Sequence, residues 1–189
     1  YFSIIILTLI LSSYLFEYYL SNSLMNKEEL QILKIKKKMY NDKTGKIWDE
    51  RSQYQVYRNL LKTKPNAVPY FYPTQLNINA KKVHSLSGVS NSPTVFCNEN
   101  GYYSITNSDR YGFNNPDNEW NSEEFEFVFV GDSFTHGYCV NRPKDIPSVI
   151  RNLSNKSTLN LGYGRNGPLI EYAVLREYLP KKTKNIIFM

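Results

Sequence analysis

The last third of the chain alternates between strand-like and helical segments, and this alternation most constrains the fold. The strand-like runs are rich in apolar residues, and helical patterns separate them. In chain order the segments are Phe125–Val130, Ile146–Leu153, Thr158–Leu161, Leu169–Leu179 and Asn185–Met189. Near-continuous apolar strands that alternate with helices are typical of a parallel sheet buried by helices. We therefore predict an α/β fold for residues 124–189.

The second helical segment also predicts which of its side chains meet the sheet. The apolar residues that we expect on that face are Leu169, Tyr172, Ala173, Leu175 and Leu179. Ligands of parallel sheets bind beyond the carboxyl ends of the strands. Ser133 follows the first predicted strand and the Gly-rich loop Gly162–Pro168 follows the second. We expect the functional site where these two segments meet.

Ser133 has the surroundings that a nucleophilic serine needs. A serine hydroxyl attacks a carbonyl only with a general base, hydrogen-bond donors for the oxyanion, and exposure to substrate. Gly131 allows a sharp turn at the end of the strand, and Asp132 can hold that turn by bonding nearby backbone. The backbone N–H of Ser133 itself can serve as one oxyanion donor.

The segment Gly131–Thr135, reading GDSFT after an apolar strand, resembles the first motif of the SGNH (GDSL-type) hydrolases. Asn160–Pro168, about thirty residues on, resembles the second motif of that family. Asp109–Pro116 resembles a loop that often precedes the first motif in membrane-linked members. The resemblance covers about residues 124–189. It implies a three-layer flavodoxin-like parallel sheet, truncated at its C-terminus, with esterase, lipase or carbohydrate O-acyl-ester activity.

The resemblance also implies roles for individual residues. Ser133 would be the nucleophile, and Gly131, Asp132 and Thr135 would support its turn. The oxyanion and substrate loop would comprise Gly164, Arg165, Asn166 and Gly167. Arg165 departs from the small residue expected there, so its side chain must point away from the site or contact substrate. The competing interpretation of this loop is a tight turn without substrate contact.

The general base of the family is not among these motifs. The chain begins at Tyr1 and ends at Met189 inside an apolar run. We therefore expect a fragment that lacks the family's later Asn and its Asp-x-x-His, and that is inactive by itself. His136 is badly placed to reach the Ser133 hydroxyl and is better explained by local packing or a substrate contact. His84 lies in an irregular region.

Residues 1–20 form an uncharged apolar run, apart from Glu17, that nearly meets the length of a membrane span. A membrane anchor at Tyr1–Leu20 is the favoured interpretation, and a signal peptide and a buried core helix are the alternatives. Residues 21–73 are expected to form a helical stalk followed by a Pro-rich linker. The stalk should break at Asn41–Gly45, and a helical pattern resumes over Trp48–Leu61. Residues 74–123 should form an irregular region with short strands that packs on the catalytic domain.

The net charge of +6 is concentrated in Lys27–Lys46, which holds seven lysines and three acidic residues. A solvated helix face is the favoured explanation, with lipid headgroups as the alternative, and we expect no nucleic-acid partner. The lysines favour a cytoplasmic location for the chain that follows the anchor, whereas a cell-envelope substrate favours an extracytoplasmic one. For Cys97 and Cys139 we expect two thiols, unless the domain faces an oxidising compartment. The spacing of the cysteines and histidines supports no metal site, and no cofactor is expected.

These features predict a single-pass membrane-anchored serine esterase of SGNH type. Its partners would be the membrane, through Tyr1–Leu20, and an acyl or acetyl ester, with an acylated carbohydrate as one candidate. Two alternatives remain at this point: an O-acyltransferase acting on a cell-envelope glycan, and a non-catalytic binding module on the same fold.

Overall fold

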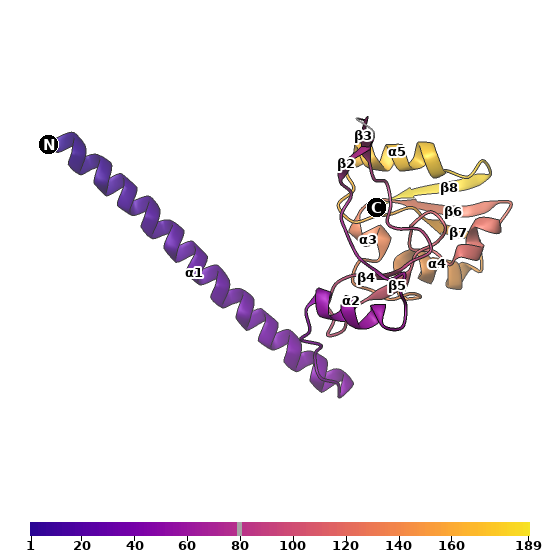
Figure 1. Ribbon diagram of the computed structural model, residues 1–189, viewed down its shortest axis with the longest axis horizontal. Helices are drawn as coiled ribbons and strands as arrows, with labels where there is room; N and C mark the ends of the chain where they lie inside the picture. Colours follow the sequence, from indigo (N-terminus) through magenta and orange to yellow (C-terminus); the bar gives the residue numbers. More distant parts are fainter. Residues whose placement is uncertain (79–80) are drawn as a thin grey trace. The chain divides into compact units, whose positions relative to one another are not determined.

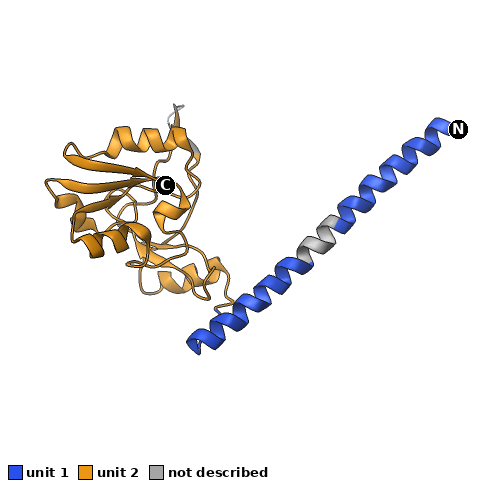
Figure 2. Ribbon diagram, turned by 180° about the vertical axis from the view of Figure 1, so that it is seen from behind, with its two compact units in different colours: residues 1–48 blue, residues 49–189 orange. Residues whose placement is uncertain are grey.

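The computed structural model describes residues 1–78 and 81–189, so positions 79 and 80 of the expected irregular region lie outside the described residues. The chain divides into two compact units, Tyr1–Trp48 and Asp49–Met189, which Figure 2 shows in different colours.

The first unit is built on one long helix, α1 (Phe2–Thr44). Its segment Phe2–Leu20 has a mean hydropathy of 1.6 and no buried residue. At 1.5 Å per residue, 19 residues extend about 28 Å, close to the hydrocarbon thickness of a bilayer. The helix is therefore long and apolar enough to cross a membrane. It ends where the sequence predicts a break, because Gly45 adopts a left-handed conformation (φ 66°) and its N–H bonds Asn41 O at 2.7 Å.

The second unit begins with short elements that precede the parallel sheet. Helix α2 (Gln53–Leu61) starts later than the helical pattern suggested, because Ser52 forms a capping box with Gln55. The other elements are β1 (Val68–Pro69), β2 (Gln75–Ile78), β3 (Lys81–His84), β4 (Pro93–Val95), β5 (Ile105–Asn107) and the short 3₁₀ helix η1 (Asp117–Asn121). Strand β4 pairs with β1 in parallel and with β5 antiparallel, while β2 and β3 form a hairpin. The Pro-rich stretch expected as a linker thus contains a paired strand.

The parallel sheet predicted from the apolar runs is confirmed. Strand β6 (Phe125–Val130) lies between β7 (Thr158–Asn160) and β8 (Thr183–Phe188) and is parallel to both. The intervening helices are α3 (Ser133–His136), α4 (Ile146–Ser154) and α5 (Pro168–Tyr178). Figure 1 shows β6 and β8 pointing towards the end of the sheet where α3 lies. Ser133 therefore emerges at the carboxyl end of the central strand.

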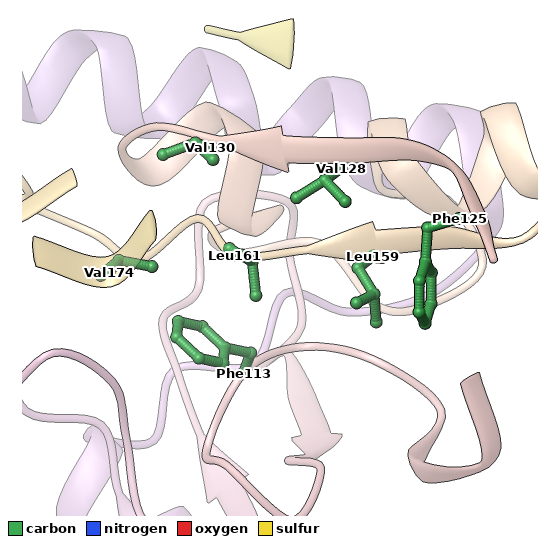
Figure 3. Packing of buried hydrophobic residues seen from close by; sticks show 7 residues of the cluster. All are labelled: Phe113, Phe125, Val128, Val130, Leu159, Leu161 and Val174. Atoms are coloured by element: carbon green, nitrogen blue, oxygen red, sulfur yellow. The ribbon is translucent and has the colours of Figure 1, made fainter. Parts of the chain in front are cut away.

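The main core joins this sheet to α5 and to the loop before β6. Its fully buried members, shown in Figure 3, are Phe113, Phe125, Val128, Val130, Leu159, Leu161 and Val174. The predicted sheet face of α5 was partly wrong, since Leu169 is 84% exposed and Tyr172 is 61% exposed. Leu175 meets this core as predicted, and the other residues of α5 that do so are Ile170, Val174 and Tyr178. Both stripes have helical spacing, and contact with the sheet selects the one centred on Val174.

Candidate active site around Ser133

Ser133 is the first residue of α3, directly after a tight turn that leaves β6. Gly131 has φ 156°, and a Cβ there would collide with the carbonyl oxygen of Met189 and with Thr135 Oγ1, so the turn requires glycine. Asp132 caps α3, its Oδ1 accepting a hydrogen bond from Phe134 N at 3.0 Å. The turn thus presents Ser133 from a rigid support at the end of the strand.

The loop after β7 packs directly against this turn. A Cβ on Gly162 would lie 2.5 Å from Thr135 Cβ and 2.7 Å from His136 N, so only glycine allows this approach. Tyr163 N donates to Gly131 O at 3.1 Å. Two residues on, a Cβ built on Gly164 would lie 3.9 Å from Ser133 Cβ. The structure thus brings together the two segments that the sequence singled out.

Three backbone N–H groups at this junction lack acceptors. Among the described residues, the N–H groups of Ser133, Gly164 and Arg165 donate no hydrogen bond. Arg165 is held at φ 63°, and the carbonyl of Gly164 accepts from Tyr70 Oη at 3.3 Å, which fixes the orientation of the Gly164–Arg165 peptide. Free N–H groups beside a serine are the donors that an oxyanion requires.

The remaining predicted loop residues take different positions. The guanidinium of Arg165 stacks over the ring of Tyr72 at 3.7 Å, and the residue is exposed. Asn166 is 8% exposed, and neither of its side-chain amide atoms has a hydrogen-bond partner among the described residues. Gly167 caps α5 and has open space where a Cβ would lie. Nothing in the structure requires glycine at position 167.

A buried amide network holds the two segments in register. Asn115 pairs through its side chain with both backbone groups of Asn160, at 2.8 Å each. Asn160 in turn donates from Nδ2 to Thr135 O at 2.8 Å and accepts at Oδ1 from Gly162 N at 2.9 Å. The Asp109 carboxylate anchors Asn115 at 2.8 Å. The loop Asp109–Pro116 therefore positions the turn that carries Ser133. It does so through the hydrogen bonds of Asn115 and Asn160.

A pocket of about 370 Å³ opens beside Ser133, which contributes to its lining. The lining also includes Tyr138 and Val140, which flank Cys139. The expectation of two thiols was wrong, because Cys97 and Cys139 form a disulfide with a Cα–Cα distance of 5.0 Å. Their separation of 42 residues hid the proximity, which arises because the segment after α3 packs against the end of β4.

His136 packs in the interior at the other end of α3. Its ring lies 4.9 Å from the ring of Phe96 and 5.2 Å from that of Tyr163, between centroids. Burial lowers the pKa of His136 to about 3. A neutral imidazole enclosed by aromatic rings cannot exchange protons with the Ser133 hydroxyl. His84, the other histidine, is exposed in β3.

The low pKa of His136 predicts a pH-dependent stability. Unfolded histidine titrates near 6.5, so between about pH 3 and 6.5 the unfolded chain binds more protons at this position than the folded protein. The neutral His136 therefore adds to the free energy of unfolding above pH 6.5. This added stability is lost as the pH falls, and the free energy of unfolding then decreases with a slope approaching about 1.4 kcal/mol per pH unit. Urea unfolding between pH 5 and 7 should show this slope. It should be reduced in His136→Phe and retained in His84→Gln; equal slopes in both variants would contradict the assignment.

Sequence reasoning missed the aromatic residues that complete the site. Tyr70 reaches Gly164 across 94 positions, and Tyr138 contacts Tyr72 through hydroxyls 3.3 Å apart. Tyrosine is frequent throughout this chain, so no local signal distinguished these residues.

No protein-family model, curated protein or solved structure matches the chain. Function must therefore be inferred from the site itself.

Proposed function

We propose that the protein is a membrane-anchored serine esterase of SGNH type with Ser133 as its nucleophile. The observation that carries this is the junction of two loops at the carboxyl ends of β6 and β7. There Gly164 lies against Ser133, the N–H groups of Ser133, Gly164 and Arg165 donate no hydrogen bond to the described residues, and a pocket opens beside Ser133. A turn serine with a purely structural role requires neither the pocket nor the free N–H groups.

The chemistry follows from these groups. Ser133 Oγ attacks the ester carbonyl carbon, and the N–H groups of Ser133 and of the Gly164–Arg165 turn stabilise the resulting oxyanion. The C–O bond to the alcohol breaks as the proton taken from serine passes to the leaving alcohol oxygen, and water then hydrolyses the acyl-serine to the free acid and regenerates the serine hydroxyl. A general base must accept the serine proton, and His136 is excluded by burial.

The strand order and the disulfide are compatible with the finer details of this proposal. Strand order β7-β6-β8 with intervening helices is compatible with part of a flavodoxin-like SGNH sheet. The disulfide Cys97–Cys139 favours an oxidising, extracytoplasmic compartment for the catalytic unit, against the orientation suggested by the lysines after the apolar helix. An extracytoplasmic esterase beside a membrane would meet acylated carbohydrates of the cell envelope as substrates.

The proposal is tested by assaying the full-length protein with short-chain p-nitrophenyl esters, with heat-denatured protein as the control. Release of p-nitrophenol that requires the folded protein is expected. Incubation with an acylated glycan should give the free acid, whereas transfer of the acyl group to a second glycan would identify an acyltransferase instead. Folded protein without either activity would favour a non-catalytic binding module.

A further inference from the structure

The pocket beside Ser133 differs in chemistry from the loop on which Gly164 lies. Four of its lining residues have apolar or aromatic side chains, namely Phe134, Tyr138, Val140 and Ile146. Phe134 is 73% exposed and Ile146 is 41% exposed. Large apolar side chains that remain open to solvent beside a nucleophile gain stability when an apolar ligand covers them.

The polar residues of the lining offer little to a sugar. Glu99 and Lys144 are both exposed and carry opposite charges. Asp145 is 2% exposed, and its Oδ1 already accepts the N–H of Ser148 at 3.0 Å to cap α4. Its Oδ2 is fully buried, so it is not accessible from the pocket. A carbohydrate hydroxyl enclosed among the apolar residues would lose its water partners without replacement.

Geometry assigns the groups of an ester to different sides of Ser133. The carbonyl oxygen must lie near the free N–H groups of Ser133 and the Gly164 turn, so the acyl chain and the alcohol take the remaining directions. Arg165, stacked on Tyr72, makes the Gly164 side polar. The apolar pocket is therefore the favourable location for the acyl chain.

Building on the esterase function proposed above, we propose that this pocket holds the acyl chain and selects esters of medium-length apolar acids over acetate. The pocket has a volume of about 370 Å³, so an acetyl methyl would leave most of it unfilled. The Cys97–Cys139 disulfide fixes the segment between Tyr138 and Val140 and thereby maintains the pocket in the absence of ligand. Each buried methylene favours binding by about fourfold.

The test compares p-nitrophenyl octanoate with p-nitrophenyl acetate on the full-length protein. The ratio of kcat/KM for octanoate to that for acetate should exceed about tenfold in the wild type. Val140→Trp, and separately Ile146→Trp, should lower this ratio at least about tenfold by filling the pocket. Leu153→Trp is the matched control, because Leu153 lies on α4 at 81% exposure and does not line the pocket. A wild-type ratio near one, or an unchanged ratio in both pocket variants, would overturn the proposal.

A binding measurement separates this inference from the esterase function. Titration of the Ser133→Ala protein, reconstituted in nanodiscs, with octanoate should show saturable binding that Val140→Trp weakens at least about tenfold and Leu153→Trp retains. If hydrolysis does not depend on Ser133 but this pattern holds, the esterase function fails and the acyl pocket stands. If hydrolysis depends on Ser133 but octanoate binding is the same in all three proteins, the acyl pocket fails alone.

Discussion

Replacing Ser133 by alanine is expected to lower kcat for ester hydrolysis by the full-length protein at least about 10³-fold. The substitution removes the atom that forms the acyl intermediate, and residual catalysis would come only from the oxyanion donors and substrate binding. The Ser133 hydroxyl makes no hydrogen bond with other described residues, so the urea unfolding midpoint should stay unchanged. Ser133→Ala should therefore lose hydrolytic activity and keep the stability of the wild-type protein.

Ser154→Ala provides the matched control for this prediction. Ser154 ends α4, and its hydroxyl donates to Ile150 O and accepts from Lys156 N, both local partners at that end of the helix. Its removal should leave kcat within about twofold, since Ser154 is half-buried at the end of α4 and does not line the pocket beside Ser133. Retained hydrolysis in Ser133→Ala would remove the serine from the mechanism.

Replacing Asp109 by alanine is expected to destabilise the folded protein by about 3–5 kcal/mol. Its carboxylate is fully buried and accepts four hydrogen bonds, from Tyr111 N, Phe113 N, Asn115 Nδ2 and Trp120 Nε1. Burial raises the pKa of Asp109, and these four donors oppose that rise. Alanine would leave all four donors without this acceptor, two of them buried and two partly buried. Urea unfolding at pH 7 measures the loss.

Two substitutions check the cause of this destabilisation. Asp109→Asn keeps one carbonyl oxygen for the backbone donors and should cost less than alanine. Asp117→Ala removes a carboxylate from η1, directly after this loop, but Asp117 is solvent-exposed in its ion pair with Arg110, so the loss should be much smaller. Equal losses in Asp109→Ala and Asp117→Ala would show that the buried network does not hold the loop.

The parallel sheet could be predicted because its signal is local. Each of its strands is a short apolar run, and the start of α3 is marked by glycine and aspartate in the sequence. The packing face of α5 could not be predicted, because two apolar stripes share one helix and only tertiary contact distinguishes Val174 from Leu169.

The candidate site divides in the same way. Ser133 and the glycines of the second loop carry conformational signals that sequence reveals. Tyr70, Tyr138 and the Cys97–Cys139 disulfide depend on contacts between residues that are distant in the chain. The buried position of His136 is also a tertiary effect, produced by the ring of Phe96, directly after β4, and that of Tyr163 in the loop after β7.

Covalent labelling tests the nucleophile assignment most directly. The full-length protein is treated with a fluorophosphonate, which reacts with activated serines, and the modified peptide is located by mass spectrometry. One adduct per molecule on Ser133 is predicted, lost when the protein is denatured before treatment. An adduct on another of the serines, or a folded and hydrolytically active protein without any adduct on Ser133, would contradict the account.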